Sequence, residues 1–182
     1  MKIDRRQLGK TVSHALRHAP HLYELDVDDE GWTSAEALLD ALRHHRRAWG
    51  GLTMADIEAM VETNSKKRYE LIDGRIRALY GHSLPGKLLK TPGEPPEVLY
   101  HGTDPEIAAL IRRDGLRAMH RQYVHLSVDV ATAMEVGRRK DDAPVLLTVR
   151  AREAYAAGHP FYAGNHLVWL ADDGVPPAFI DG

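Results

Sequence analysis

The sequence predicts an α+β fold in two lobes, on three observations. Three segments within residues 5–61 carry apolar residues at helical spacing. Residues 68–80 then alternate apolar and polar side chains around Asp73-Gly74, which is typical of a β-hairpin. From residue 98 onward, short strand-like and helix-like segments follow one another. Each lobe is therefore expected to contain both helices and strands.

The first predicted helix covers residues 5–19, where Leu8, Val12 and Leu16 form an apolar stripe. Pro20 should end it, because a proline ring disfavours helical geometry in the preceding residue. Two capping boxes open the next helices, Thr33 with Glu36 and Thr53 with Asp56. Three helices followed by a hairpin is the order of a winged-helix module, which we expect over residues 1–82.

Residues 83–97 are rich in proline and should form a connector. Residues 98–182 should form a second lobe. Its predicted strands are 97–103, 123–127 and 144–151, with a last strand and its tail in 166–180. Its predicted helices are 104–116, which Asp104 caps, and 129–140. No GxGxxG follows the first strand, so a Rossmann dinucleotide site is not supported.

Composition and charge limit the kinds of partner that the protein is expected to bind. The 24 Lys and Arg residues against 26 Asp and Glu give a net charge of -2, so an anionic partner needs a local basic cluster. Residues 1–90 hold 15 basic and 13 acidic side chains, and residues 91–182 hold 9 and 13, so the first half is the better candidate for touching a polyanion. There is no cysteine and no apolar run of membrane-spanning length. We expect a cytoplasmic monomer with no membrane contact.

Arg17 and His18 end the first predicted helix. At 100° per residue, Arg17 falls almost opposite the apolar stripe and His18 lies on its flank beside His14, so neither is expected in the core. Taken alone, this pair fits a solvated surface. His14 and His18 at positions i and i+4 could hold a metal, but no third ligand is evident, so no metal is expected.

Two further clusters contain residues suited to binding anions or nucleotides. Lys66, Lys67 and Arg68 open the hairpin; they fit either a solvated face or a phosphate site, because an arginine fork can grip two phosphate oxygens. In LYHGT, His101-Gly102-Thr103 ends a strand, and the glycine could let a ligand approach the backbone. In RQYVHLS, His125 and Ser127 share one strand face, four and six residues after Arg121.

Together these motifs resemble the RNA 2′-phosphotransferase family, Tpt1/KptA. The resemblance runs in order through LRH with its proline, GW before a capped helix, N-x-K-x-R-aromatic at 64–69, LYHGT, the helix ending in DGL, R-x-x-VHLS, and LVWL with VPP. It implies an N-terminal winged helix that holds RNA and a C-terminal ADP-ribosyltransferase-like lobe that binds NAD⁺. Tyr69 stands where the family more often has Phe.

The resemblance also implies a two-step, NAD⁺-consuming removal of an internal RNA 2′-phosphate. Its products are 2′-OH RNA, nicotinamide and ADP-ribose 1″,2″-cyclic phosphate. By motif, the catalytic residues are Arg17, His18, Arg68 and Arg121. The NAD⁺-binding residues are His101, Gly102, Thr103, His125 and Ser127, and Lys66 supports the RNA phosphate. A histidine that titrates near neutrality could donate to a phosphate oxygen or transfer a proton, and residue type alone leaves both roles open. If all these groups meet one phosphate, the first helix faces the cleft between the lobes.

Two other functions remain open. An ADP-ribosyltransferase acting on nucleic-acid terminal phosphates could use the same pocket and stop after the first step. A winged-helix DNA-binding regulator would need a basic third helix, whereas MADIEAMVETN is acidic. The LVWLADD strand shows no evident ADP-ribosyltransferase glutamate, which weakens the reading as a protein-modifying enzyme. Whether the RNA belongs to tRNA splicing is also open.

Overall fold

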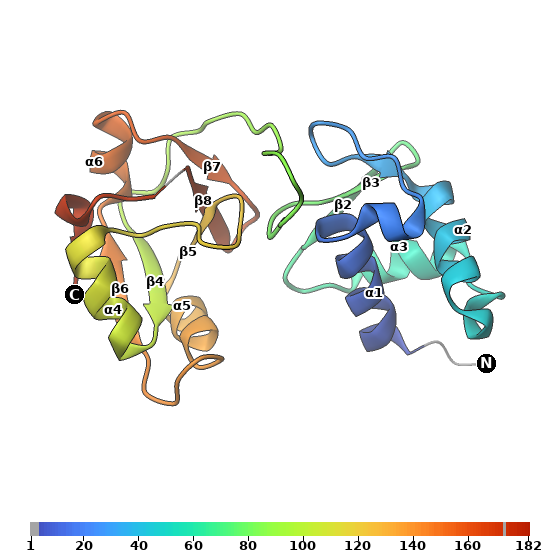
Figure 1. Ribbon diagram of the computed structural model, residues 1–182, viewed down its shortest axis with the longest axis horizontal. Coiled ribbons are helices and arrows are strands. Elements are labelled where there is room, and N and C mark those ends of the chain that lie inside the picture. The colour runs from blue at the N-terminus through green and yellow to red at the C-terminus, as the bar shows by residue number, and fades with distance from the viewer. Residues whose placement is uncertain (1–3, 173) are drawn as a thin grey trace. The chain divides into compact units, whose positions relative to one another are not determined.

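The computed structural model describes residues 4–172 and 174–182 (Figure 1). The chain divides into two compact units, Met1–Leu89 and Lys90–Gly182, and this division lies within the predicted connector. Each unit has its own antiparallel sheet, its own helices and its own apolar core. The α+β class predicted from the sequence is therefore confirmed.

Three helices and a three-stranded sheet form the N-terminal unit. The helices are α1 (Arg5–Arg17), α2 (Ala35–His45) and α3 (Met54–Glu62), with 3₁₀ turns η1 (Pro20–Tyr23) and η2 (Arg47–Trp49) between them. The strands are β1 (Thr33–Ser34), β2 (Tyr69–Ile72) and β3 (Arg75–Ala78), in the order β1-β3-β2. Asp73 and Gly74 both have positive φ, 47° and 74°, as a tight hairpin turn requires.

A side-chain cap begins each of these three helices. Asp4 accepts hydrogen bonds from the backbone of Arg6 and Gln7 at the start of α1. Thr53 and Asp56 form both bonds of the predicted capping box on α3. The box predicted at Thr33 is wrong by one residue, because Ser34 caps α2 and Thr33 pairs with Ile76 across the sheet.

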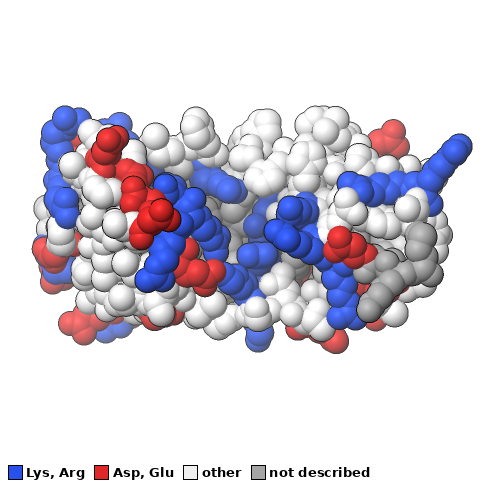
Figure 2. Space-filling view, turned by 90° about the horizontal axis from the view of Figure 1, so that it is seen from below, with Lys and Arg blue, Asp and Glu red and all other residues white. Residues whose placement is uncertain are grey.

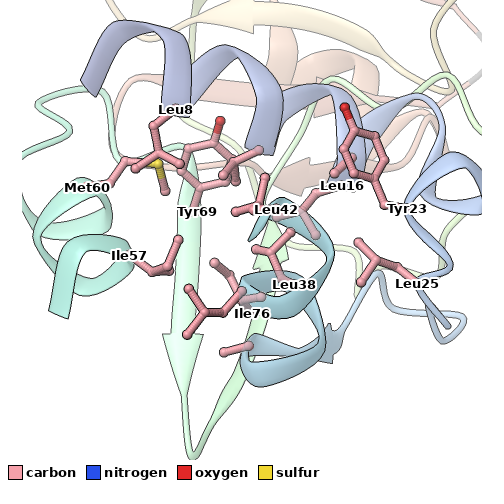
Figure 3. Packing of buried hydrophobic residues seen from close by; sticks show 14 of the residues in the cluster. Leu8, Leu16, Tyr23, Leu25, Leu38, Leu42, Ile57, Met60, Tyr69 and Ile76 are labelled. Carbon is pink, nitrogen blue, oxygen red and sulfur yellow. The ribbon is translucent and has the colours of Figure 1, made fainter. Parts of the chain in front are cut away.

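The core of the N-terminal unit lies between the helices and the sheet (Figure 3). Leu8 and Leu16 of α1 meet side chains from the other two helices and from the hairpin. Tyr69 of β2 is also in this cluster and is only 6% exposed. The first residue of the hairpin is thus held by core packing, which positions Arg68 immediately before it.

The C-terminal unit is built on a six-stranded sheet in the order β7-β8-β5-β4-β6-β9, with every pairing antiparallel. Its strands are β4 (Leu99–Thr103), β5 (Val124–Ser127), β6 (Val145–Val149), β7 (Phe161–Ala163), β8 (Val168–Ala171) and β9 (Ile180–Asp181). Its helices are α4 (Pro105–Asp114), α5 (Val130–Gly137), α6 (Ala151–Ala156) and the 3₁₀ turn η3 (Pro177–Phe179). The short elements α6, β7 and β9 were not predicted. None of the helices described is long and apolar enough to cross a membrane.

Candidate active site

Arg17 is buried, contrary to the sequence prediction. Its side chain is 9% exposed, and its guanidinium carbon lies 5.5 Å from the ring centre of Tyr69 and 5.1 Å from that of Tyr80. The helical wheel failed because it considers α1 alone, whereas residues 69 and 80 at the two ends of the hairpin place rings against this side of the helix. Burial raises the pKa of Tyr69, and the nearby charge of Arg17 opposes that rise.

His18 is held by Ser83, a residue that the sequence analysis missed. The backbone N–H of Ser83 donates to the carbonyl oxygen of Arg17 at 2.9 Å, and its hydroxyl lies 2.7 Å from Nδ1 of His18. One residue therefore binds both members of the Arg17-His18 pair. No local pattern indicates this, because the two bonded side chains are 65 positions apart in the sequence.

The structure brings His18 and Arg68 into one groove of about 690 Å³ in the N-terminal unit. Basic and polar groups dominate its lining, which has no acidic residue in the part of the chain that the structure describes. The lining residues are Arg5, Arg6, Gly9, Lys10, Ser13, His14, His18, Met60, Thr63, Asn64, Ser65, Arg68 and Tyr69. Such a groove is electrostatically suited to an anionic ligand.

A tight turn before β2 presents Arg68. The side-chain oxygen of Asn64 accepts a hydrogen bond from the backbone N–H of Lys66 at 3.2 Å. The backbone carbonyl oxygen of Asn64 accepts another from the backbone N–H of Lys67 at 2.8 Å. Lys67 adopts a positive φ of 38° at this turn. Lys66 is half-buried and is not one of the residues that line the groove.

Arg121 belongs to the other unit. It lies exposed in the turn before β5, where its N–H donates to the carbonyl oxygen of Ala118 at 2.9 Å. Together with Arg117, Gln122 and His159 it lines a pocket of about 740 Å³. Two arginines and a histidine suit this pocket to an anionic group, and the acidic Asp114 in its lining is paired with Arg113.

His101 and His125 lie on neighbouring strands, β4 and β5. Nδ1 of His101 is 3.1 Å from the carbonyl oxygen of His125. Because a carbonyl only accepts, Nδ1 carries the proton in this bond and Nε2 of the neutral ring is left as an acceptor. Burial lowers the pKa of His101; the bond to His125 opposes this effect and the charge of Lys140 adds to it. His101 is therefore neutral at physiological pH.

The backbone of α5 fills the space beside Gly102. A Cβ atom at this position would lie 2.1 Å from the carbonyl oxygen of Ala133 and 3.3 Å from the backbone nitrogen of Gly137. The glycine is thus needed for strand–helix packing, and this side of it is closed to a ligand, unlike the open backbone suggested by the sequence.

Thr103 is fully buried, and its hydroxyl has no hydrogen-bond partner within residues 4–172 and 174–182. Ser127 pairs with Tyr100 across β4 and β5.

The predicted site residues therefore form three groups within the two units. Arg17, His18 and Arg68 lie around the end of α1 and the start of the hairpin. The five predicted NAD⁺-binding residues lie on β4 and β5, and none of them lines the pocket of Arg121.

The two histidines considered as metal ligands each bond to another side chain. His14 and His18 bond to Tyr23 and Ser83, respectively, through Nδ1. Across the described parts of the chain, no cluster of three or more His, Asp or Glu side chains is placed to hold a metal ion.

Comparison with known proteins defines the class. Residues 4–173 match the family model described as "RNA 2'-phosphotransferase, Tpt1 / KptA family". A protein of Bacillus thuringiensis subsp. konkukian named "Probable RNA 2'-phosphotransferase" is 51% identical over 173 residues, which covers 95% of this chain and 92% of the relative. Proteins of the same name from Acetivibrio thermocellus and Pseudomonas aeruginosa are 49% and 44% identical; the alignments cover 98% of this chain in both cases, and 97% and 98% of the relatives.

This chain belongs to the Tpt1/KptA family of RNA 2′-phosphotransferases. The resemblance drawn from its sequence motifs is thereby confirmed.

Proposed function

We propose that this protein is an NAD⁺-dependent RNA 2′-phosphotransferase that removes an internal 2′-phosphate from RNA. The observation that carries the proposal is the meeting of His18 and Arg68 in one basic groove of a chain that belongs to this family. These two residues come from motifs 50 positions apart in the sequence. Their shared groove gives an RNA phosphate a place to bind.

The reaction has two steps, with NAD⁺ as a consumed substrate. An oxygen of the RNA 2′-phosphate forms a bond to the anomeric carbon of the nicotinamide ribose, and the carbon–nitrogen bond breaks to release nicotinamide. The 2″-hydroxyl of the attached ADP-ribose then loses its proton as its oxygen bonds to phosphorus. The bond from phosphorus to the RNA 2′-oxygen breaks, and that oxygen takes a proton. The products are 2′-OH RNA and ADP-ribose 1″,2″-cyclic phosphate.

Arg17, Arg68 and Arg121 are assigned to stabilising negative charge on the phosphate oxygens. Guanidinium groups keep their charge at any working pH and can do this without a metal ion. The rings of Tyr69 and Tyr80 restrain Arg17, so its charge is already oriented before substrate binds. Preorganised charge of this kind stabilises a transition state without reorganisation during the reaction.

His18 is assigned to the proton transfer or hydrogen bond at the reacting phosphate. Nδ1 is engaged by Ser83, and Nε2 is the ring nitrogen assigned to the substrate. A histidine in such a position can protonate the leaving 2′-oxygen in the second step. Lys66, half-buried beside the Asn64 turn, is assigned to electrostatic support of the same RNA phosphate.

The NAD⁺ site is assigned to the β4–β5 region, with His101, Gly102, Thr103, His125 and Ser127. Two observations fit a polar ligand there. Nε2 of His101 is an acceptor suited to a ribose hydroxyl or an amide N–H, and the buried Thr103 hydroxyl has no hydrogen-bond partner in the described residues. Gly102 contributes through its packing on α5, which lets β4 and the helix approach closely.

The two units take separate roles in this proposal. The N-terminal unit, with three helices followed by a hairpin, is assigned as a winged-helix module that holds RNA. The C-terminal unit is assigned as an ADP-ribosyltransferase-like lobe. In this assignment His18 of the N-terminal unit and Arg121 of the C-terminal unit act on the same phosphate. A monomer working in the cytoplasm suffices for such a reaction.

The test is to incubate the purified protein with a 2′-phosphorylated RNA and NAD⁺ alone, and to identify the nucleotide products. Release of ADP-ribose 1″,2″-cyclic phosphate together with 2′-OH RNA is expected. Accumulation of ADP-ribosylated RNA without cyclic phosphate would instead support an enzyme that stops after the first step. Recovery of the 2′-phosphate intact would reject both reactions.

A further inference from the structure

The groove beside His18 extends along α1 as a stripe of positive and titratable side chains. Arg6, Lys10, His14 and His18 follow one another at four-residue intervals, and all four line the groove. Residues four apart lie on the same face of a helix. Figure 2 shows basic side chains gathered in several groups on one face of the protein, with acidic side chains beside some of them. Among the described residues that line this groove, none is acidic.

The two fixed cations of this stripe, Arg6 and Lys10, are not paired with acidic side chains of the described residues. Within residues 4–172 and 174–182, Arg6, Lys10 and Arg68 make no ion pair, whereas elsewhere in the same unit Arg43, Arg75 and Arg77 bind Asp40, Asp28 and Glu70. Arg5 differs from Arg6 and Lys10, because its charge acts on an acidic side chain, that of Asp56. Hydrogen bonds from Thr53 lower the pKa of Asp56, and the charge of Arg5 adds to that effect. Arg6 and Lys10 are therefore the cations most available to a ligand.

The spacing of these charges fits a nucleic-acid backbone. Four residues of helix advance about 6 Å along the axis, which is close to the distance between successive phosphates of an extended single strand. Arg6 and Lys10 are exposed long side chains that can follow such a backbone. The hydroxyl and amide groups of Ser13, Thr63, Asn64 and Ser65 on the groove wall can bind ribose hydroxyls.

We propose that this groove binds the sugar-phosphate backbone of single-stranded RNA, with Arg6 and Lys10 each holding a phosphate next to the 2′-phosphorylated nucleotide. The proposal rests on the proposed function for the position of the reacting phosphate at His18 and Arg68. It adds a binding track that begins at the reaction site and runs toward the start of α1. Longer RNA should therefore bind more tightly than a dinucleotide.

The test measures binding of a fluorescently labelled single-stranded RNA without a 2′-phosphate, so that no chemistry is needed. The variants are Arg6→Gln and Lys10→Gln. Arg47→Gln is the matched control, because Arg47 is an exposed arginine of the same unit outside the groove. For each groove variant, we expect weaker binding and a plot of log affinity against log salt that is shallower by about 0.7. Arg47→Gln should keep the wild-type slope.

A second measurement compares KM for a 2′-phosphorylated dinucleotide and for a longer RNA that carries the same phosphate. In wild type the longer RNA should have the lower KM, and this advantage should shrink in Arg6→Gln and Lys10→Gln. Equal losses of binding in the groove variants and in Arg47→Gln would overturn the proposal, because they would show only an effect of net charge. Wild-type binding by both groove variants would overturn it as well. Groove-dependent binding without any 2′-phosphate removal would support the track and reject the proposed function.

Discussion

The hydroxyl of Ser83 lies 2.7 Å from Nδ1 of His18, and the backbone N–H of Ser83 binds the neighbouring carbonyl of Arg17. The hydroxyl holds the imidazole ring through Nδ1, and the backbone bond fixes Ser83 next to it. A partner on one ring nitrogen determines which tautomer the other nitrogen presents to a substrate. Ser83 is therefore a positioning residue for His18 in the proposed reaction.

Replacing Ser83 by alanine should lower kcat by roughly fivefold to tenfold, since one oriented hydrogen bond contributes about 1 kcal/mol. Ser83→Thr keeps the hydroxyl and should retain most of the activity. Imidazole nitrogen NMR provides a readout independent of turnover: the His18 signals should change in Ser83→Ala, while those of His14, which binds Tyr23, should not. Unchanged His18 signals in the alanine variant would contradict this role.

His18→Ala and Arg121→Ala should each lower kcat by about 100-fold or more, because each removes a group assigned to the reacting phosphate. Single-turnover assays would show which of the two steps is lost. Arg139→Ala is the control for Arg121, because Arg139 lies just after α5 and pairs with Glu135. Normal turnover in either site variant would refute the assigned roles.

Gly102→Ala should destabilise the C-terminal unit by about 1–3 kcal/mol, because the new methyl group would overlap the carbonyl of Ala133. Gly9→Ala in α1 is the matched substitution, since nothing apart from its chain neighbours and the nearby helix backbone lies within 4 Å of its added Cβ. This control should raise stability by about 0.5–1 kcal/mol, as expected for alanine within a helix. Urea denaturation of both variants measures the difference, and equal effects would contradict the packing role of Gly102.

The stability of the protein should rise with pH in the range just below 6.5, the usual pKa of histidine. Burial lowers the pKa of His101 in the folded state, so between the two pKa values the unfolded chain binds more protons. Above 6.5 this contribution is complete, and it is lost as the pH falls. Urea denaturation at several pH values should show a weaker dependence in His101→Gln. His120→Gln, at an exposed position in the same unit, should keep the wild-type dependence.

Local sequence patterns identified much of the architecture. The hairpin at Asp73-Gly74 and the caps at Thr53 and Asp104 all occur as predicted, because each depends on residues within a few positions of one another. The motifs also identified the family. The short elements β7 and β9 escaped prediction, because strands of two or three residues carry too little periodicity to be recognised and form only by pairing with β8 and β6.

The surroundings of the candidate catalytic residues were decided by tertiary structure. The sequence alone determined that Arg17 and His18 end a helix, and its motifs indicated the RNA 2′-phosphotransferase family. Only the fold showed that Tyr69 and Tyr80 bury Arg17, that Ser83 holds His18, and that Arg68 shares a groove with it. The physical reason is distance along the chain. A helical wheel describes one helix in isolation, whereas these contacts join residues that lie close together only after α1, the hairpin and the segment after it have packed.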